Sequence, residues 1–71
     1  MGEPGTAQLH TTLPVHRARL GLTQAALAER AGITRKSVNA IEAGNMVPSV
    51  VLALKLAQAL EVPVEELFAL A

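Results

Sequence analysis

Cysteine is absent from the sequence, as are tryptophan, tyrosine and aspartate, and Phe68 is the only aromatic residue. Without cysteine the chain can form neither a disulfide nor a thiolate metal site, and two histidines, His10 and His16, cannot build a closed zinc site. At 71 residues the chain has room for one domain and little room for a catalytic pocket. These absences argue against an enzyme, and we expect no catalytic residue, no cofactor and no metal.

Long hydrophobic runs are also missing. A spanning helix needs roughly 20 apolar residues, and the longest candidate, residues 50–60, is interrupted by Lys55 and Gln58. The N-terminal region holds Glu3 and no basic cluster, unlike a secretion signal. We therefore expect no membrane partner and a cytoplasmic location.

The net charge is zero, which at first sight disfavours a nucleic-acid partner, but the charges are unevenly distributed. Residues 16–43 carry five basic and two acidic residues, a net charge of +3, whereas residues 44–71 carry one basic and three acidic residues, a net charge of −2. Glu3 supplies the remaining −1. Residues 16–43 would face a polyanion, although they offer few cationic side chains to bind phosphate.

The hydrophobic pattern predicts five short helices and no strand, an all-α fold. Residues 1–13 have no periodicity and are expected to form a flexible arm, followed by one helix-turn-helix domain over residues 14–71. Pro14 would start the first helix, and Thr23, Thr34 and Ser49 would cap the next three. Residues 50–60 are apolar on most sides, which predicts the central core helix, and a last helix would open at Pro63 so that Leu67, Phe68 and Leu70 cover the core.

Residues 24–43 are the most informative segment because they fit two helices crossing at a steep angle. Ala28 stands where the helices approach most closely and must be small. Gly32 stands at the turn, where a positive φ is expected and a Cβ would clash. The remaining buried contacts would come from Leu27, Ala31, Ile33, Val38 and Ile41. This arrangement is typical of a DNA-reading helix-turn-helix, with the second helix over residues 34–43.

Several motifs in the chain resemble a known family. They are Leu22-Thr23-Gln24, Leu27-Ala28, Ala31-Gly32-Ile33-Thr34-Arg35, Ile41-Glu42-Ala43-Gly44, Pro48-Ser49 and Glu66-Leu67-Phe68. Over about residues 14–70 the sequence is similar to the lambda-repressor-like, Cro-type (XRE) helix-turn-helix regulators. The resemblance implies a compact five-helix domain that binds double-stranded DNA as a homodimer on a near-palindromic operator. Repressor and activator both stay open, and a repressor is expected because so short a chain has little surface for contact with polymerase.

The resemblance also implies roles for individual residues. Base contacts would come from Arg35, Lys36 and Asn39, and arginine and lysine do suit the guanine edge in the major groove. Phosphate contacts would come from Gln24, Thr34, Ser37 and Asn45, the last of these in a loop that uses backbone N–H groups. Arg17 and Glu42 would form an internal ion pair.

The sequence departs from the family pattern at a few positions. Glu61 stands where relatives often have the glycine that closes the fourth helix, at a cost of about 1 kcal/mol if the left-handed conformation is kept. Pro63 replaces the usual Ser or Thr cap, and Ala40 offers DNA only a methyl group. The loop at residues 45–47 lacks the Lys and Arg that many relatives place near phosphate. The methyl group of Ala40 and the uncharged loop predict a modest binder, or one that needs dimerisation or a partner.

Simpler interpretations stay open at this stage. Arg35 and Lys36 could be a solvated helix face, Gln24 an ordinary helix start, and Arg17 and Glu42 independent surface charges. Asn39 could face either the groove or solvent, and Met46 and Val47 could form an exposed loop or a dimer contact. Arg19 and Arg30 fit solubilising charges. The alternative function is an antitoxin or adaptor module whose main partner is another protein.

Overall fold

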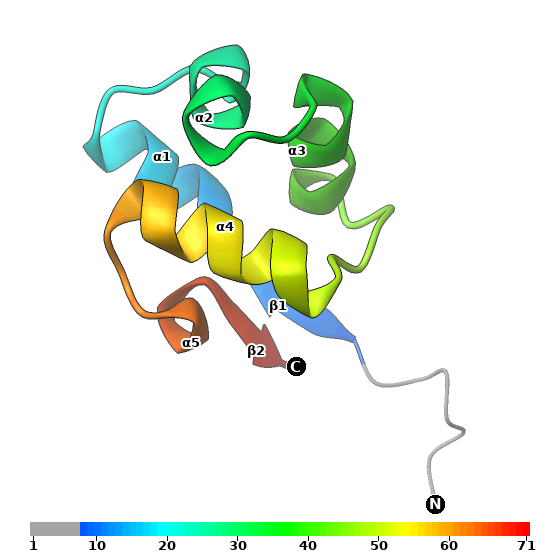
Figure 1. Cartoon of the computed structure of the whole chain (residues 1–71). Helices are drawn as coiled ribbons and strands as arrows, with labels where there is room; N and C mark the ends of the chain where they lie inside the picture. Colours follow the sequence, from blue (N-terminus) through cyan, green and yellow to red (C-terminus); the bar gives the residue numbers. More distant parts are fainter. Residues whose placement is uncertain (1–7) are drawn as a thin grey trace, which may run out of the picture.

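Residues 8–71 are described by the computed structural model, and they form five helices and one two-stranded antiparallel sheet (Figure 1). In chain order the elements are β1 (Leu9–Thr11), α1 (Leu13–Arg19), α2 (Gln24–Ala31), α3 (Arg35–Glu42), α4 (Val50–Leu60), α5 (Val64–Leu67) and β2 (Phe68–Leu70). In Figure 1, α4 crosses the middle of the molecule, with α2 and α3 on one side and the sheet on the other. The predicted five-helix fold is confirmed.

The helix starts follow from side-chain capping. The hydroxyl groups of Thr23, Thr34 and Ser49 each accept a hydrogen bond from the backbone N–H of the residue three positions later in the chain, at 3.0–3.1 Å. Each cap satisfies one of the donors that a helix start leaves unpaired. The three predicted capping residues are confirmed, while α1 begins at Leu13, one residue before Pro14.

The turn between α2 and α3 is closed by Gly32, which has φ +73°. An L-residue with a side chain rarely adopts this conformation, so glycine is favoured. The predicted steric clash is wrong, however, because a Cβ on Gly32 would meet no atom within 4 Å. Only the backbone conformation, and not a close approach, selects glycine at this turn.

The core forms where the facing sides of the helices meet. Its buried hydrophobic residues are Leu13, Leu27, Ala28, Val38, Ile41, Leu56, Ala57, Ala59, Leu60 and Leu67. Ala31 and Ile33 are half-buried and pack against this cluster, as the helix-turn-helix pattern predicts. The core therefore fixes α3 relative to α2 and leaves the start of α3 in solvent.

The prediction of no strand is wrong at the two ends of the chain. Leu9 pairs with Leu70, His10 with Ala69 and Thr11 with Phe68. The hydroxyl of Thr12 also donates to the backbone oxygen of Glu66 at 2.6 Å. Residues 9–13 therefore belong to the fold and do not form the predicted flexible arm. The remaining residues of that prediction, 1–7, lie outside the part of the chain that the structure describes.

Two further expectations about packing hold only in part. The second half of α4 is buried, as a core helix should be, but the first half is not, because Val50, Val51 and Leu54 are more than half exposed. Leu70 does not cover the core, because α5 ends at Leu67 and the following strand turns Leu70 into solvent. Hydrophobicity on all sides of a helix does not tell which side finds a partner.

Glu61 keeps the left-handed conformation at the end of α4, with φ 60° and ψ 40°. It is the only non-glycine residue with positive φ in residues 8–71. Its carboxylate accepts a hydrogen bond from Arg30 at 3.0 Å, in an exposed ion pair. In the same range, no helix has the length and the hydrophobicity needed to cross a membrane.

Candidate nucleic-acid interface

The first turn of α3 presents the three predicted base-contacting residues together. Arg35, Lys36 and Asn39 are all exposed and line one shallow hollow. The helix beneath them is held by the Thr34 cap at one end and by the buried Val38 and Ile41 on its inner face. Contact with base edges requires a helix with a fixed backbone. It also requires exposed cationic and amide side chains at the start of that helix.

The hydroxyl groups of Thr34 and Ser37 lie 3.0 Å apart, and Thr34 donates to Ser37. Thr34 also accepts the capping hydrogen bond from the backbone N–H of Ser37 at 3.1 Å. The hydroxyl hydrogen of Thr34 is thereby used within the protein, whereas that of Ser37 remains free to donate. Of these two predicted phosphate contacts, only Ser37 can donate from its side chain while this arrangement lasts.

An ion pair joins α1 to the last residue of α3. Nε of Arg17 donates to Oε2 of Glu42 at 2.8 Å, and Nη2 donates to Oε1 at 3.2 Å. The exposed fractions of the two side chains are only 23% and 8%. The structure thus contains the internal pair that the family resemblance implies. The hydrogen bond to Glu42 raises the pKa of Arg17 above its ordinary value, despite an opposing effect of desolvation, so Arg17 stays cationic at any physiological pH.

Gln24, at the start of α2, joins this pair. Its Nε2 donates to Oε1 of Glu42 at 3.0 Å. An amide nitrogen carries two hydrogens, so one remains for an outside acceptor such as a phosphate oxygen. Nη1 of Arg17 also donates to the backbone oxygen of Leu22 at 2.9 Å, which holds the segment leading into α2. Glu42, the last residue of α3, therefore links α1, α2 and α3.

Sequence reasoning missed both the hydrogen bond between Gln24 and Glu42 and the anchoring of Leu22. The residues that form them are spaced along the chain without any local pattern. The polar character of Gln24 at a helix start was the single available signal, and it suggested contact with solvent or DNA only. The network could be found only once the helices were placed in space.

Asn45 differs from what the family resemblance implies. Its backbone N–H donates to the carbonyl of Ala40 at 2.9 Å, in the turn that closes α3. Gly44 precedes it with φ +79°, which is typical of this type of helix end. The N–H is therefore not free, and a phosphate contact from Asn45 would have to use its exposed side chain.

The other arginines have partners on different parts of the surface. Nη1 of Arg19 lies 3.2 Å from Nδ1 of His16, a mostly buried histidine on α1. Arg30 pairs with Glu61. Neither arginine adjoins the hollow at the start of α3, which leaves Arg35 and Lys36 as the cations of that hollow.

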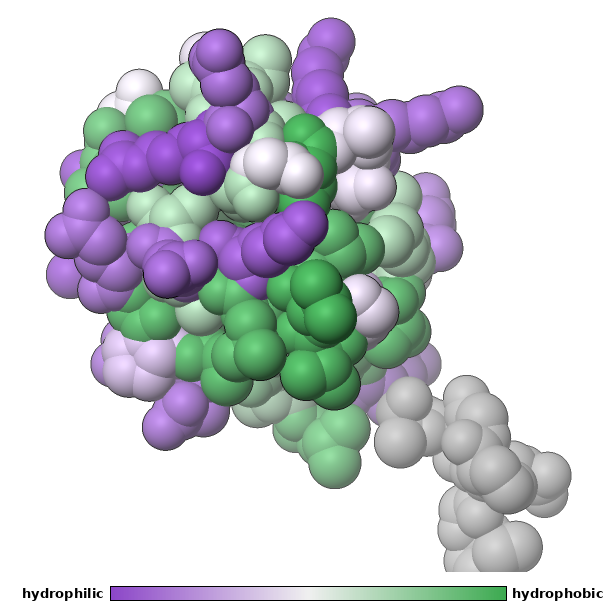
Figure 2. All heavy atoms as spheres, in the orientation of Figure 1, coloured by the Kyte–Doolittle hydropathy of each residue, from purple (hydrophilic) through white to green (hydrophobic). Residues whose placement is uncertain are grey.

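Polar side chains are common around α2 and α3. On the face shown in Figure 2, hydrophilic side chains project from the upper part, where α2 and α3 lie in Figure 1, and hydrophobic residues gather in the lower centre, with further hydrophilic side chains at the lower left. The starts of α2 and α3 add the partial positive charge of helix N-termini to the two free cations. This side of the molecule suits an extended polyanion that exposes hydrogen-bonding groups in a groove.

Comparison with protein families gives one match across most of the chain. The family model described as "Helix-turn-helix" matches residues 16–67. The matched range begins within α1 and ends at the last residue of α5, so it includes the ion pair, the capped α3 and the turn between α2 and α3.

Several curated proteins are similar in sequence. An uncharacterized HTH-type transcriptional regulator of Methanothermobacter thermautotrophicus is 48% identical over 52 residues, which cover 73% of this chain and 75% of that protein. The uncharacterized HTH-type transcriptional regulator YgzD of Bacillus subtilis is also 48% identical over 52 residues, covering 73% and 79%.

A solved structure has the same fold. The restriction-modification controller protein C.AhdI of Aeromonas hydrophila superposes with a TM-score of 0.73 at 39% sequence identity. The match covers 76% of this chain and 82% of C.AhdI.

Proposed function

Because this chain belongs to the helix-turn-helix family of DNA-binding transcriptional regulators, we propose that it binds a near-palindromic operator as a homodimer and represses transcription there. In this proposal Arg35, Lys36 and Asn39 contact base edges in the major groove. Gln24, Ser37 and the start of α3 at Thr34 contact backbone phosphate, with Asn45 contributing its side chain.

The observation that carries the proposal is the free start of α3. Arg35 and Lys36 are exposed and adjoin Asn39, while the Thr34 cap and the buried Val38 and Ile41 hold the helix that carries them. A helix presented in this way inserts its first turn into the major groove. A guanidinium can donate to both guanine O6 and N7, which is worth about 1–3 kcal/mol of discrimination against another base.

The homodimer is supported by the small number of cations. A domain with net charge zero and two free cations at its reading helix releases few counterions, so one copy alone would bind weakly. Two copies would place their α3 helices in successive major grooves about 34 Å apart. Repression follows from occupancy, because a bound dimer excludes polymerase without any further contact. Such a role would place the protein in the cytoplasm.

Selection of bound duplexes from a random library tests this proposal. The wild-type chain is expected to enrich one motif with two inverted half-sites. Lys36→Ala is expected to relax the preference at one base position in each half-site. If Lys36→Ala instead lowers the affinity for all duplexes alike, Lys36 is a phosphate contact. Enrichment of no motif by the wild-type chain would contradict the proposal.

A second candidate function is an adaptor or antitoxin whose main partner is another protein. It is favoured by the exposed apolar side chains of the first half of α4. Under this candidate, Arg35→Ala leaves the cellular function intact, because DNA reading would not matter. Under the operator proposal, Arg35→Ala weakens regulation, because one base contact is lost.

A further inference from the structure

The carboxylate of Glu42 accepts more hydrogen bonds than any other side chain in residues 8–71. Oε2 accepts one from the guanidinium of Arg17, and Oε1 accepts one from that guanidinium and one from the amide of Gln24. Only 8% of the Glu42 side chain is exposed. A carboxylate that is shared by two donors and shielded from water has a fixed position, so it can also fix the position of a neighbouring group.

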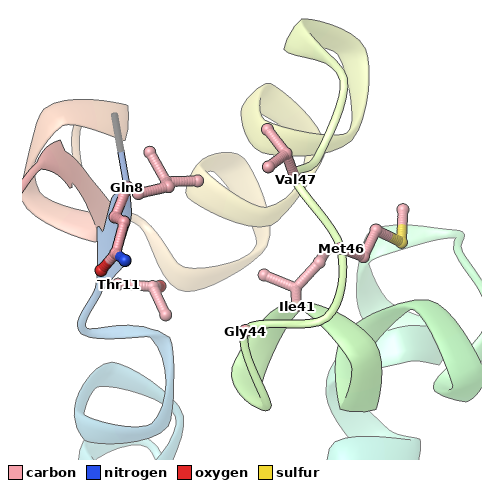
Figure 3. Close-up of a pocket in the computed structure, with 7 residues that line it drawn as sticks. Gln8, Thr11, Ile41, Gly44, Met46 and Val47 are labelled. Carbon is pink, nitrogen blue, oxygen red and sulfur yellow. The ribbon is translucent and has the colours of Figure 1, made fainter. Parts of the chain in front are cut away.

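The backbone that carries Glu42 is held by the core. Ile41, the preceding residue, is only 2% exposed and belongs to the buried cluster. Figure 3 shows its side chain beside the hollow that separates the end of α3 from Thr11 of β1. The helix then closes through the N–H of Gly44, which donates to the carbonyl of Ile41 at 3.1 Å. Contacts within the fold therefore fix both the backbone and the carboxylate of Glu42.

This carboxylate selects one of two orientations of the Gln24 amide. The oxygen and the nitrogen of a side-chain amide are similar in size, and a half-turn about the last side-chain bond exchanges them. An ionised carboxylate accepts hydrogen bonds and donates none, so only the nitrogen of Gln24 can face Glu42 at 3.0 Å. In the exchanged orientation two oxygens would meet there and repel each other. The selected orientation leaves the second hydrogen of this nitrogen for an acceptor outside residues 8–71.

The charge of Glu42 is cancelled by its own partner. A lone carboxylate near DNA repels phosphate, but two of the three hydrogen bonds to Glu42 come from the guanidinium of Arg17. Because Gln24 is neutral, the three side chains together carry no net charge. Glu42 can therefore orient an amide next to a polyanion without placing a net negative charge there.

We propose that Glu42 is a positioning residue for DNA binding, whose carboxylate holds the Gln24 amide in the orientation that offers its second N–H to a backbone phosphate. This inference rests on the proposed phosphate contact of Gln24 and names the residue on which that contact depends. Glu42 itself touches no DNA in this arrangement. Since a phosphate contact carries no sequence information, Glu42 should strengthen binding to every duplex by the same factor.

Glu42→Gln tests the inference because charge alone and amide orientation predict opposite results. The substitution keeps the size of the side chain and removes one negative charge, so charge alone predicts tighter binding to DNA. The new amide can present either its oxygen or its nitrogen, so it no longer holds Gln24 in one orientation. Glu29→Gln is the matched control, because Glu29 is exposed on α2 and forms neither of the ion pairs in residues 8–71.

Affinities are measured with one duplex at one salt concentration for the wild type, Gln24→Ala, Glu42→Gln and the double variant. Urea denaturation verifies that each variant is folded under the conditions of the titration. Glu42→Gln is expected to weaken binding about 3- to 10-fold, the contribution of one hydrogen bond, whereas Glu29→Gln should bind as the wild type does or more tightly. In the Gln24→Ala background, Glu42→Gln should no longer weaken binding.

Two results of this comparison would overturn the inference. The first is an equal loss of affinity with and without Gln24, because Glu42 would then act on the fold alone. The second is binding by Glu42→Gln that is as tight as binding by Glu29→Gln, because only charge would then matter.

NMR spectroscopy tests the same inference in the unaltered chain. The two hydrogens on Nε2 of Gln24 give separate signals in a ¹⁵N-labelled sample. We expect the signal of the hydrogen that faces Glu42 to lie downfield before DNA is added, and the other signal to shift when a duplex is added. A second signal that does not shift in the complex would contradict the inference, even if Glu42→Gln fails to fold.

The inference and the proposed function can fail separately. A phosphate contact acts on any sequence, so the four affinities can be measured with a duplex of arbitrary sequence. If the random library yields no motif while the effect of Glu42→Gln still depends on Gln24, the operator proposal fails and the role of Glu42 stands. If a motif is enriched but the effect of Glu42→Gln does not depend on Gln24, the operator proposal stands and the role of Glu42 fails.

Discussion

The amide nitrogen of Gln24 lies 3.0 Å from the carboxylate oxygen of Glu42, although 18 residues separate them in the chain. The same carboxylate holds Arg17 through two hydrogen bonds. The predicted phosphate contact of α2 is therefore held in place by an ion pair between α1 and α3. Gln24, which would fix the position of the protein on DNA, and Arg17, which stabilises the fold, both donate to the carboxylate of Glu42.

Removal of this acceptor should destabilise the protein. Glu42→Ala leaves the half-buried guanidinium of Arg17 without its partner, and we expect the free energy of unfolding to fall by about 2–3 kcal/mol. Urea denaturation measures the change. Glu29→Ala, at an exposed position of α2, should change stability by about 0.5 kcal/mol or less. Equal effects of the two substitutions would mean that the pair contributes nothing.

Substitution of Thr34 should mainly lower the stability of the protein, whereas substitution of Ser37 should mainly lower its affinity for DNA. Thr34→Ala removes the α3 cap and should lower the free energy of unfolding by about 1 kcal/mol. Ser37→Ala retains the cap and should change stability less.

In DNA titrations, Ser37→Ala should weaken binding to operator and scrambled duplex by the same factor, because a phosphate contact carries no sequence information. The salt dependence should not change, since a neutral hydroxyl displaces no counterion. A change in preferred sequence would place Ser37 among the base contacts.

The left-handed conformation at the end of α4 predicts a stabilising substitution. Glu61→Gly removes the strain of a side chain at φ 60° and should raise the free energy of unfolding by about 0.5–1 kcal/mol. The exposed ion pair with Arg30 is lost at the same time, but such pairs are worth less than about 1 kcal/mol. Arg30→Ala measures that loss by itself. If Glu61→Gly is less stable than Arg30→Ala, the strain argument does not hold.

Helices and their caps could be predicted because their signals are local. Thr23, Thr34 and Ser49 each precede an apolar-periodic segment, and Gly32 marks the turn between two of them. The strands could not be predicted, because each has three residues and its partner lies at the other end of the chain. Three residues are too few for an alternating pattern. The fully buried Leu13 falls outside the predicted helix for a different reason, because α1 begins one residue before Pro14, the predicted start.

The candidate site was predictable to a similar degree. Arg35 and Lys36 follow a cap directly, so their exposure at a helix start follows from the sequence. The use of the Asn45 N–H by Ala40 depends on how the α3 end closes, and the bond between Gln24 and Glu42 depends on tertiary packing. The hydrophobic side chains of residues 50–54 do not reveal from the sequence alone whether they pack against the core of the same chain or against another chain.

The burial of Leu13 leads to a direct prediction about the N-terminal end of the fold. Leu13→Ala should lower the free energy of unfolding by about 3 kcal/mol, because a fully buried leucine is lost from the core. Leu70→Ala, at a position that is 76% exposed, should have little effect. Thermal or urea denaturation distinguishes them. A tolerated Leu13→Ala would mean that residues up to 13 are indeed a dispensable arm.

The central claim is that the first turn of α3 reads sequence, and the ratio of affinities for operator and scrambled duplex tests it most directly. The ratio is measured at one salt concentration for the wild type, Arg35→Ala and Arg30→Ala, the last as a matched arginine away from α3. We predict that Arg35→Ala lowers the ratio about 10- to 100-fold, the loss of one bidentate base contact, while Arg30→Ala leaves it unchanged. An unchanged ratio for Arg35→Ala, with both affinities reduced alike, would contradict the account.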